Sequence, residues 1–264
     1  MGEPKLRLQG VSQVYEGARG ETCALENMNI DVASGEAIAI LGPSGCGKST
    51  SLLVAAGLRM PTSGAAFVDG QPVEGPRLNT ALILQDFGLL PWKTAAENAG
   101  LGLQVRRVPK RDRVARVADA LAKVGLADFA NAYPAELSGG MRQRLAMARA
   151  LTCDADLLLM DEPLSALDAL LREEMQDMLK RTWREQGYAQ VLVTHSIEEA
   201  VYLGQRIVVM SPRPGRVTHV VDNPEMLRED WRDDALFFDR CRALREMLRC
   251  VASGQSERGE ARHA

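Results

Sequence analysis

The segment GPSGCGKST, residues 42–50, limits the fold of this chain more than any other stretch of its sequence. An apolar run at 36–42 leads into it, and KSTSLLVAAGL at 48–58, with Gly57 as a stop signal, predicts a helix after it. Glycines in such a turn let successive amides face phosphate oxygens, and the dipole of the following helix favours an anion. The order strand, loop, helix fits the G-x-x-x-x-G-K-[S/T] pattern better than a chance glycine-rich turn, so we predict a nucleoside triphosphate site.

Two side chains of this loop are predicted to act on the nucleotide directly. Lys48 should reach the β- and γ-phosphates, and the Ser49 hydroxyl should ligate Mg²⁺. The expected cofactors of this loop are therefore a nucleoside triphosphate and Mg²⁺. The residues predicted to line the nucleotide are Gly42, Pro43, Ser44, Gly45, Cys46, Gly47, Lys48, Ser49 and Thr50.

The rest of the chain alternates short apolar runs with amphipathic stretches. Four apolar runs predict buried strands, and the alternating pattern of residues 7–15 predicts a half-exposed strand. Residues 108–126 predict a helix, and Ser196 followed by Glu199 predicts a capping box. Buried strands between helices indicate an α/β fold with parallel strands. The four runs are 80–85, 156–162, 190–195 and 206–211, and the apolar positions of the 108–126 helix are Val114, Val117, Ala118, Leu121 and Val124.

The composition narrows the class of protein. A net charge of −3 over 264 residues and a pI of about 5.8 give no sign of a general nucleic-acid binder. The sequence holds no apolar run long enough to cross a bilayer and no apolar leader at its N-terminus. Five scattered cysteines without a CxxC pair predict free thiols in a reducing, cytoplasmic compartment. These cysteines are Cys23, Cys46, Cys153, Cys241 and Cys250.

A second chemical signal is the pair of acids that ends LLLMDEP, residues 157–163. An apolar strand that ends in carboxylates places them at the carboxyl edge of the sheet, where ligands of open α/β sheets bind. Asp161 is predicted to hold Mg²⁺, and Glu162 to orient or deprotonate the attacking water. Alone, such a pair is more often a solvated strand end, but the loop at 42–50 favours the catalytic interpretation.

The third signal, ELSGGMRQRLAMARAL at residues 136–151, decides the family. Ser138, Gly139 and Gly140 stand directly before an apolar-patterned helix, as at a helix N-terminus that meets an anion. Together with the preceding motifs, this segment resembles the LSGGQ signature of the ATP-binding subunits of ABC transporters. The resemblance extends to about residue 220, and Met141 replaces the glutamine of the signature.

The resemblance implies an α/β fold of the P-loop NTPase, RecA-like type. Its core should have a mixed sheet, with an antiparallel β region at the N-terminus and an α-helical insertion that carries the signature. On this basis the core is expected at 1–87 and 153–220, and the helical insertion at 88–152. Residues 221–264 should form a C-terminal helix and a disordered tail.

Four more residues match motifs of the same family. Tyr15 resembles the aromatic residue that stacks on adenine, although a structural strand tyrosine is the alternative. Gln85 resembles the glutamine that senses Mg²⁺ and the lytic water, and His195 the histidine that contacts the γ-phosphate. Asp168, in SALD at 165–168, resembles the aspartate that couples two nucleotide sites.

The family also implies that ATP lies between two chains. Ser138, Gly139 and Gly140 would then complete the nucleotide site of a partner subunit, and Asp168 would couple the two sites. Since this sequence has one phosphate loop and one signature, it should need a second copy or a homologue, with a homodimer expected. ATP would close the pair and hydrolysis would let it open.

The segment QDFGLLPWKTAAEN at 85–98 is unusually apolar for a loop. In ABC transporters this junction lines the groove for a helix of the membrane subunit. Phe87, Leu89, Leu90 and Trp92 are therefore expected to bury against a separate permease, with Trp92 as anchor. The alternative is that they pack inside the helical insertion. The expected location is the cytoplasmic face of the inner membrane, as a peripheral subunit.

Some features resemble the importers of taurine, alkanesulfonates and nitrate. They are LLPWKTAAENAGLGL at 89–103, the signature at 137–144 and SPRPGRV at 211–217, although the last could be a plain Pro/Gly turn. In this group a solute-binding protein and the permease select the substrate. Taurine, other sulfonates, nitrate, bicarbonate-like anions and pyrimidine precursors of thiamine all stay open.

Other classes of protein explain the sequence less well. A separate-subunit exporter or lipid-handling ATPase would share every catalytic motif, and only LLPW and SPRPGRV speak against it. ABC proteins of DNA repair insert a long coiled coil before the signature, for which about 90 residues leave too little room. Ribosomal ABC proteins usually carry two ATPase units in one chain, whereas this chain has one. A GTPase would need an N-K-x-D motif, which the sequence lacks.

Overall fold

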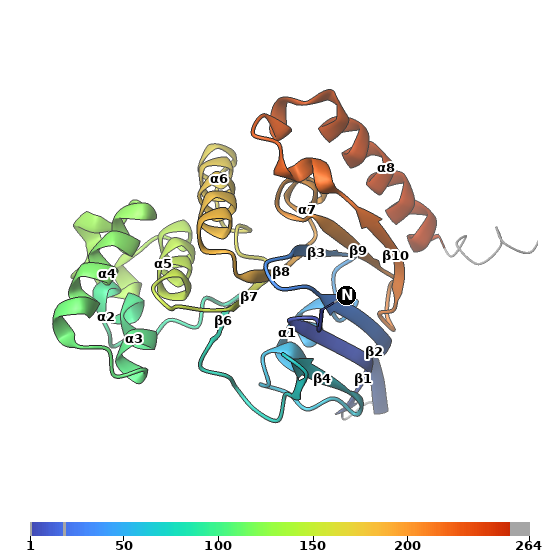
Figure 1. The fold of residues 1–264 in the computed structure, drawn as a ribbon, viewed down its shortest axis with the longest axis horizontal. Coiled ribbons are helices and arrows are strands. Elements are labelled where there is room, and N and C mark those ends of the chain that lie inside the picture. The colour runs from blue at the N-terminus through green and yellow to red at the C-terminus, as the bar shows by residue number, and fades with distance from the viewer. Residues whose placement is uncertain (1, 18–19, 254–264) are drawn as a thin grey trace, which may run out of the picture. The chain divides into compact units, whose positions relative to one another are not determined.

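The computed structural model describes residues 2–17 and 20–253 (Figure 1). The chain divides into two compact units, Met1–Pro76 with Val191–Ala264 and Arg77–Gln190. The helices expected in the insertion at 88–152 all fall in the second unit. The same unit includes strand β6 (Thr80–Ile83), on which helix α5 (Gly139–Leu151) packs. The division into core, insertion and C-terminal segment stays a prediction.

The first unit contains an antiparallel sheet near the N-terminus, as predicted. Its strand order is β2-β1-β4-β5, and β1 pairs antiparallel with both β2 and β4. Alternate residues of β1, among them Leu6 and Leu8, are buried, which is the pattern of a strand with one face on a core. The strands are β1 (Leu6–Gly17), β2 (Gly20–Val32), β4 (Ser63–Val68) and β5 (Gln71–Pro72).

A mixed group of strands lies in the same unit. Strand β3 (Ala37–Leu41) pairs parallel with β9 (Arg206–Met210), which pairs antiparallel with β10 (Val217–Asp222). Every residue of β3 is buried, as expected of a strand covered on both faces. Strand β8 (Ala189–Thr194) spans the boundary between the two units. The predicted α/β class with a mixed sheet is confirmed.

The described residues of the first unit form the α-helices α1 (Lys48–Ala55), α7 (Ile197–Leu203) and α8 (Ala235–Ala252). Helix α8 packs on α7 and contains the predicted C-terminal helix. The expected disordered tail falls mostly on residues 254–264, which lie outside the described residues. In the described part of the chain, no helix has both the length and the apolar character needed to cross a bilayer.

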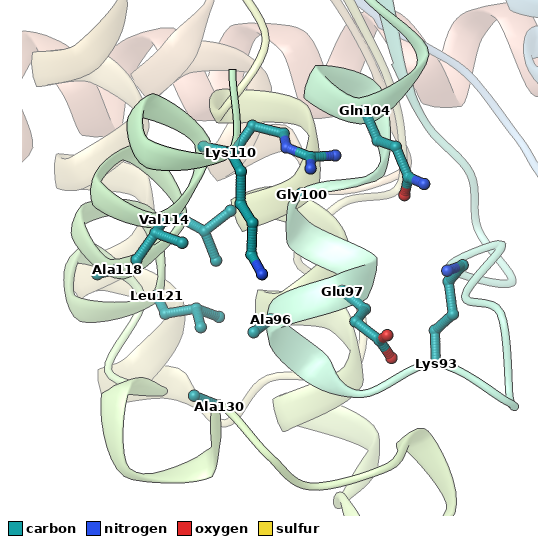
Figure 2. Close-up of a pocket in the computed structure, with 12 residues that line it drawn as sticks. Lys93, Ala96, Glu97, Gly100, Gln104, Lys110, Val114, Ala118, Leu121 and Ala130 are labelled. Atoms are coloured by element: carbon teal, nitrogen blue, oxygen red, sulfur yellow. The ribbon is translucent and has the colours of Figure 1, made fainter. Parts of the chain in front are cut away.

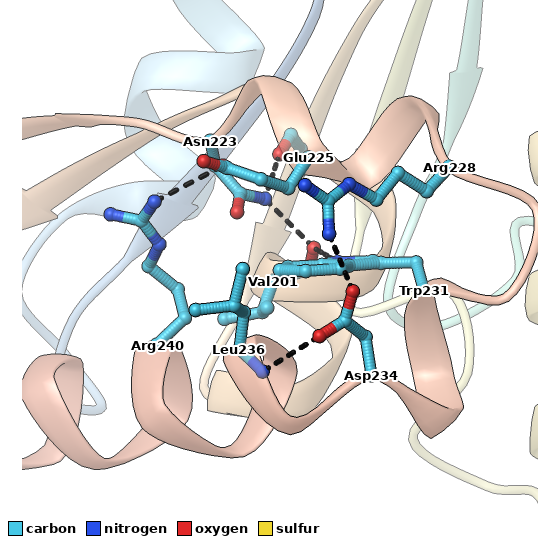
Figure 3. A network of polar contacts seen from close by, with 9 residues as sticks. Val201, Asn223, Glu225, Arg228, Trp231, Asp234, Leu236 and Arg240 are labelled. Carbon is cyan, nitrogen blue, oxygen red and sulfur yellow. Dashed lines mark hydrogen bonds and ion pairs between the residues drawn. The ribbon is translucent and has the colours of Figure 1, made fainter.

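A polar network joins the C-terminal segment to α7 (Figure 3). The Trp231 indole is buried and donates to the carbonyl of Val201 at 2.9 Å. The Asn223 amide donates to the carbonyls of Val201 and Gly204, at 2.8 and 2.6 Å. These bonds satisfy carbonyls at the C-terminal end of α7 that the helix cannot satisfy itself. The 3₁₀ turns Pro224–Leu227 and Trp231–Asp233 carry the chain from β10 to α8.

The predicted capping box at the start of α7 forms only in half. Ser196 Oγ accepts from the amide of Glu199 at 3.2 Å, as a cap should. The Glu199 carboxylate accepts instead from Thr194 Oγ1 at 2.6 Å, and the Ser196 amide donates to that same hydroxyl oxygen at 3.0 Å. The hydroxyl of Thr194, the last residue of β8, thus accepts the hydrogen bond from the Ser196 amide that a capping box assigns to the glutamate.

The second unit combines a strand pair with a helical cluster. Strands β6 and β7 (Leu157–Asp161) pair in parallel, as their apolar runs predicted. Helix α5 packs against α2, α4 and β6. The other helices of the unit are α2 (Ala95–Ala99), α3 (Leu101–Val105), α4 (Lys110–Lys123) and α6 (Ala169–Gln186), with 3₁₀ turns at Ala127–Phe129 and Pro134–Glu136.

Helix α4 is shorter than predicted, and part of its apolar face is exposed. Val117 and Leu121 are buried, and so is Val124 directly after the helix. Val114 is 61% exposed and Ala118 is also exposed, because no described element covers the N-terminal part of that face. Of the apolar positions that fall at helical spacing, these two are therefore exposed, and the other three are buried.

Candidate functional site

The phosphate loop, residues 42–50, has the conformation that its glycines predicted. Helix α1 begins at Lys48, and its N-cap Gly47 has φ +99°. A Cβ at Gly47 would lie 2.6 Å from the carbonyl oxygen of Ala24 and 2.7 Å from Leu25 Cδ2. Both the backbone angle and the close approach require glycine here. Gly45, with φ +77°, turns the loop in the same way.

Lys48 is buried and held inside the loop. Its Nζ donates to the carbonyls of Gly42 and Pro43, at 2.8 and 3.0 Å. Ser49 is exposed in the first turn of α1. The loop therefore presents a cation, an exposed hydroxyl and a helix N-terminus, which together suit a polyphosphate.

Cys46 lies in the loop as a buried thiol. Burial raises its pKa, and the charge of Lys48 opposes this shift. The thiol is therefore neutral near pH 7 and serves as a small apolar side chain.

The SPRPGRV segment lies directly behind the phosphate loop. Arg213 Nε donates to the carbonyl of Gly45 at 3.1 Å. The Gly215 amide donates to Ala24 at 3.0 Å, and a Cβ at Gly215 would lie 1.8 Å from the carbonyl oxygen of Cys46. The sequence indicated a Pro/Gly turn here; the structure shows that this turn supports the loop.

Tyr15 lies on β1 beside helix α1. Its hydroxyl is 3.0 Å from Thr50 Oγ1, and the Arg59 guanidinium lies over its ring at 4.7 Å from the centroid. The half-buried ring lines a pocket of about 460 Å³. The other residues of this pocket are Val14, Glu16, Glu21, Arg59 and Thr62. The side chain is thus fixed at its hydroxyl end, and a cation contacts one face of its ring.

His195 follows β8 and precedes Ser196, the N-cap of α7. Its side chain is exposed. It belongs to the same compact unit as the phosphate loop and Tyr15. The remaining predicted residues belong to the second unit.

The two predicted acids end strand β7. Asp161 is buried, and Glu162 is half-buried with φ +48°, a backbone angle that costs free energy in a residue other than glycine. Gln143 of α5 holds this turn: its Nε2 donates to the Glu162 carbonyl at 3.1 Å, and its Oε1 accepts from the Ala166 amide at 2.9 Å. Sequence reasoning missed Gln143, because a glutamine in an amphipathic helix carries no positional signal.

The signature residues begin helix α5, as predicted. Ser138 is the N-cap, and its Oγ accepts from the Met141 amide at 3.2 Å. This bond uses the backbone of residue 141 only, so methionine in place of glutamine leaves the cap intact. A Cβ at Gly140 would lie 3.2 Å from Leu167 Cδ2, so Leu167 packs against the signature. Asp168 is the residue that follows Leu167. Asp168 itself caps α6, with Oδ1 accepting from Leu171 at 3.0 Å.

The 85–93 loop follows β6, and Gln85, its first residue, is exposed. Phe87 and Gly88 are successive left-handed residues, with φ +66° and +54°. Phe87, Leu89 and Leu90 are half-buried, whereas Trp92 is 70% exposed. The loop thus combines partial packing in the second unit with one strongly exposed aromatic side chain.

Two polar side chains from neighbouring helices hold this loop. Asn98 of α2, fully buried, accepts from the Leu90 amide at 2.8 Å and donates to the Leu90 carbonyl at 3.1 Å. Its amide also lies 2.9 and 3.0 Å from the carbonyls of Lys93 and Thr94.

Arg149 of α5 is the second of these side chains. It donates to the carbonyls of Phe87 and Gly88, at 2.7 and 2.6 Å. Burial lowers the pKa of its guanidinium, while Cys153 and Asp86 oppose this shift.

Beside the loop, the exposed part of α4 faces α2 across a pocket of about 500 Å³ (Figure 2). Val114, Ala118 and Leu121 form one apolar wall, and Ala96 and Gly100 lie opposite. The polar residues around this pocket are Lys93, Glu97, Gln104, Lys110 and Arg113, three of which are cationic. Since Lys93 ends the 85–93 loop, the exposed Trp92 and this pocket are neighbours along the chain.

A family model for ABC transporters matches residues 25–165 of the chain. The chain belongs to the ABC transporter family. It is 50% identical over 220 residues to the taurine import ATP-binding protein of Burkholderia pseudomallei, covering 83% of this chain and 85% of that protein. With the protein of the same name from Pelagibacter ubique it shares 45% identity over 210 residues, 79% of each chain.

Solved structures agree with this assignment. The ATP-binding cassette MJ0796, described as a dimer bound to ADP and Pi, matches with a TM-score of 0.77 and 33% identity over 82% of this chain and 98% of that one. The predicted P-loop NTPase fold is confirmed. So is the activity: the chain is the nucleotide-binding, ATP-hydrolysing subunit of an ABC importer, and the exporter alternative is not favoured.

Proposed function

We propose that this ABC subunit powers the uptake of taurine or a closely similar sulfonate through a separate permease. The similarity to taurine import ATP-binding proteins, 45 to 50% over about four fifths of the chain, supports this substrate class. A solute-binding protein would deliver the substrate to the permease. Nitrate, bicarbonate-like anions and pyrimidines are the competing substrates.

The catalytic roles follow from the chemistry of phosphoryl transfer, which is mainly positioning and charge neutralisation. Lys48, fixed by two loop carbonyls, binds the β- and γ-phosphates. Glu162 accepts a proton from the attacking water or orients it, and His195 contacts the γ-phosphate. Tyr15 stacks on the adenine, with its hydroxyl anchored on Thr50. The amides of residues 42–50 bind the remaining phosphate oxygens.

A magnesium ion fits the donors that the chain offers. Mg²⁺ takes hard oxygen ligands and often only one or two from the protein, with nucleotide phosphates and waters as the others. The exposed Ser49 hydroxyl and the Asp161 carboxylate are such donors, and Gln85 supplies an amide oxygen. When bound, the ion neutralises charge on the phosphates.

A second ATPase subunit completes each nucleotide site. Ser138, Gly139 and Gly140 act on the partner's nucleotide from the exposed N-terminus of α5, and Asp168 couples the two sites. The dimeric form of the similar cassette supports this arrangement. Because the motifs of one chain suffice for two equal sites, a homodimer is the simplest assembly.

The permease docks at the 85–93 loop and the pocket beside it, which places the chain at the cytoplasmic face of the membrane. A helix of the permease would bury Trp92 and set an apolar side chain between α2 and α4. Lys93, Lys110 and Arg113 favour acidic residues on that helix, while Glu97 is the one acid of the pocket. Phe87, Leu89 and Leu90 contribute their exposed parts.

One experiment tests this function. The Glu162→Gln chain would be purified with ATP from detergent-solubilised membranes of its own cell, and its partners identified by mass spectrometry. We expect slowed hydrolysis, a nucleotide-bound dimer and a co-purified multi-span permease. Reconstitution with taurine and with nitrate would then decide the substrate. A soluble partner without any membrane protein would contradict the proposal.

A matched pair of variants tests the docking surface. Trp92→Ala should lower recovery of the permease by about tenfold, as the loss of an aromatic anchor does at other interfaces. Phe129→Ala removes another exposed aromatic side chain of the same unit and should leave recovery unchanged. Equal recovery with both variants would remove Trp92 from the interface.

A further inference from the structure

The 85–93 loop is held in a conformation that its own residues do not favour. Phe87 has φ +66°, a left-handed angle at which a bulky side chain is strained, and Gly88 continues the turn at φ +54°. Such a backbone persists only where its surroundings fix it. The carbonyls of these two residues accept from a single side chain, Arg149, at 2.7 and 2.6 Å.

Arg149 is part of a helix that reaches two other segments of the ATPase. Helix α5 starts at the Ser138 cap, and Gln143 in its second turn bonds the Glu162 carbonyl and the Ala166 amide. Arg149 lies about two turns beyond Gln143 on the same 13-residue helix. A displacement of the loop is therefore linked to the turn that carries Glu162 through two hydrogen-bonded side chains, Arg149 and Gln143, on one helix.

We propose that Arg149 is a positioning residue that couples the 85–93 loop to helix α5, so that engagement of the loop by the permease adjusts Gln143 and the signature residues. This inference rests on the proposed docking of the permease at the loop. Its basis is that both hydrogen bonds of the Arg149 guanidinium are short and go to the strained turn at Phe87 and Gly88. Asn98 holds the C-terminal half of the loop through Leu90 and Lys93.

The same helix offers a matched control. Arg144 also donates to two backbone carbonyls, those of Val124 at 2.7 Å and Gly125 at 3.3 Å. Its partners follow α4 and do not belong to the 85–93 loop. Arg149→Met and Arg144→Met each remove a cation and two hydrogen bonds from α5, but only the first removes the link to the loop.

The test uses the whole transporter in proteoliposomes, with its permease and binding protein, and taurine as the probe. The readout is the ratio of ATPase rates with and without taurine-loaded binding protein. Arg149→Met should lower this ratio by about tenfold and Arg144→Met by less than about twofold, while Arg149→Lys, which keeps one donor group, should lie between them. Equal ratios for Arg149→Met and Arg144→Met would overturn the inference.

Two further outcomes of this experiment have a defined meaning. If Arg149→Met does not assemble, the comparison passes to Arg149→Lys and Arg144→Lys, and equal ratios for these two would equally overturn the inference. If the wild-type transporter shows no taurine-stimulated ATPase, the proposed function fails together with the inference, and this is visible before any variant is measured.

Discussion

The phosphate loop and the 85–93 loop both contain left-handed backbone angles, but they accommodate these angles in different ways. Each contains two left-handed residues, Gly45 and Gly47 in the first and Phe87 and Gly88 in the second. In the phosphate loop the angles fall on glycines. In the 85–93 loop one of them falls on phenylalanine, and side chains from two helices hold the turn. Glycines accommodate the left-handed angles of the first loop, whereas side chains from two helices hold the turn of the second.

This difference matches the proposed ligand of each loop, phosphates for the first and a protein partner for the second. A loop that binds phosphates through its own amides needs left-handed backbone angles without strain, which its glycines provide. A loop that binds a protein partner can transmit its position only if other elements are attached to it. The bonds from α2 and α5 give the 85–93 loop such attachments.

The largest expected effect comes from Gly47→Ala. The added Cβ would meet the Ala24 carbonyl at 2.6 Å in a left-handed backbone, so the loop must open. We expect ATP affinity to fall by more than about 100-fold, because strain of a few kcal/mol converts to that ratio. Titration with a fluorescent ATP analogue measures it. Gly75→Ala, where a Cβ meets nothing within 4 Å, should bind normally; normal binding by Gly47→Ala would show that the phosphate loop is not locally fixed.

Asn98→Ala should act on the other loop. It removes the side chain that bonds both polar groups of Leu90 and leaves the part-buried amide of that residue without its acceptor. The free energy of unfolding should fall by about 3 kcal/mol, at roughly 1 kcal/mol for each lost hydrogen bond plus the cost of stranded polar groups. Urea unfolding followed by circular dichroism measures the loss.

The control for this prediction is Asn131→Ala, which changes an exposed asparagine of the same unit. It should lower the free energy of unfolding by less than about 0.5 kcal/mol. ATP affinity should stay unchanged in both variants. A loss of ATP affinity in Asn98→Ala alone would show that the two loops are not independent.

The difference between the two loops also explains which parts of the fold and of the site could be predicted from the sequence. The phosphate loop, the strand before Asp161 and the Ser138 cap were predictable because each depends on neighbours within a few residues. Asn98 and Arg149 carry no such pattern, and the partners of Arg149 lie 61 and 62 residues away. Their roles appear only once the helices are packed.

Other differences have the same origin. The helical spacing around Val117 correctly indicated an apolar face, but spacing cannot tell that no element among the described residues covers its end at Val114. The motif at Ser196 predicted a cap, yet Thr194 provided the hydroxyl that binds Glu199. In both cases local sequence described one element correctly and its tertiary neighbours decided the contacts.

Arg213→Ala should have a moderate effect on the phosphate loop. It removes the single hydrogen bond from the turn behind the loop to the Gly45 carbonyl, an exposed bond. We expect ATP affinity to fall by about two- to fivefold, with the maximal hydrolysis rate almost unchanged. Arg216→Ala, which removes an ion pair with Glu26 in the same turn, should change affinity less than about 1.5-fold. Equal losses in the two variants would mean that the turn, and not Arg213, supports the loop.

The smallest effect concerns the thiol inside the phosphate loop. Burial raises the pKa of Cys46, so at pH 7.5 it has less of the reactive thiolate than an ordinary cysteine, and labelling should quicken only as pH rises toward the raised pKa. Exposed Cys250 should react with iodoacetamide at least about tenfold faster, as mass spectrometry over time would measure. Rapid labelling of Cys46 at neutral pH would mean that the loop opens without nucleotide. In that case glycine geometry alone would not keep the phosphate loop closed, and the contrast with the 85–93 loop would disappear.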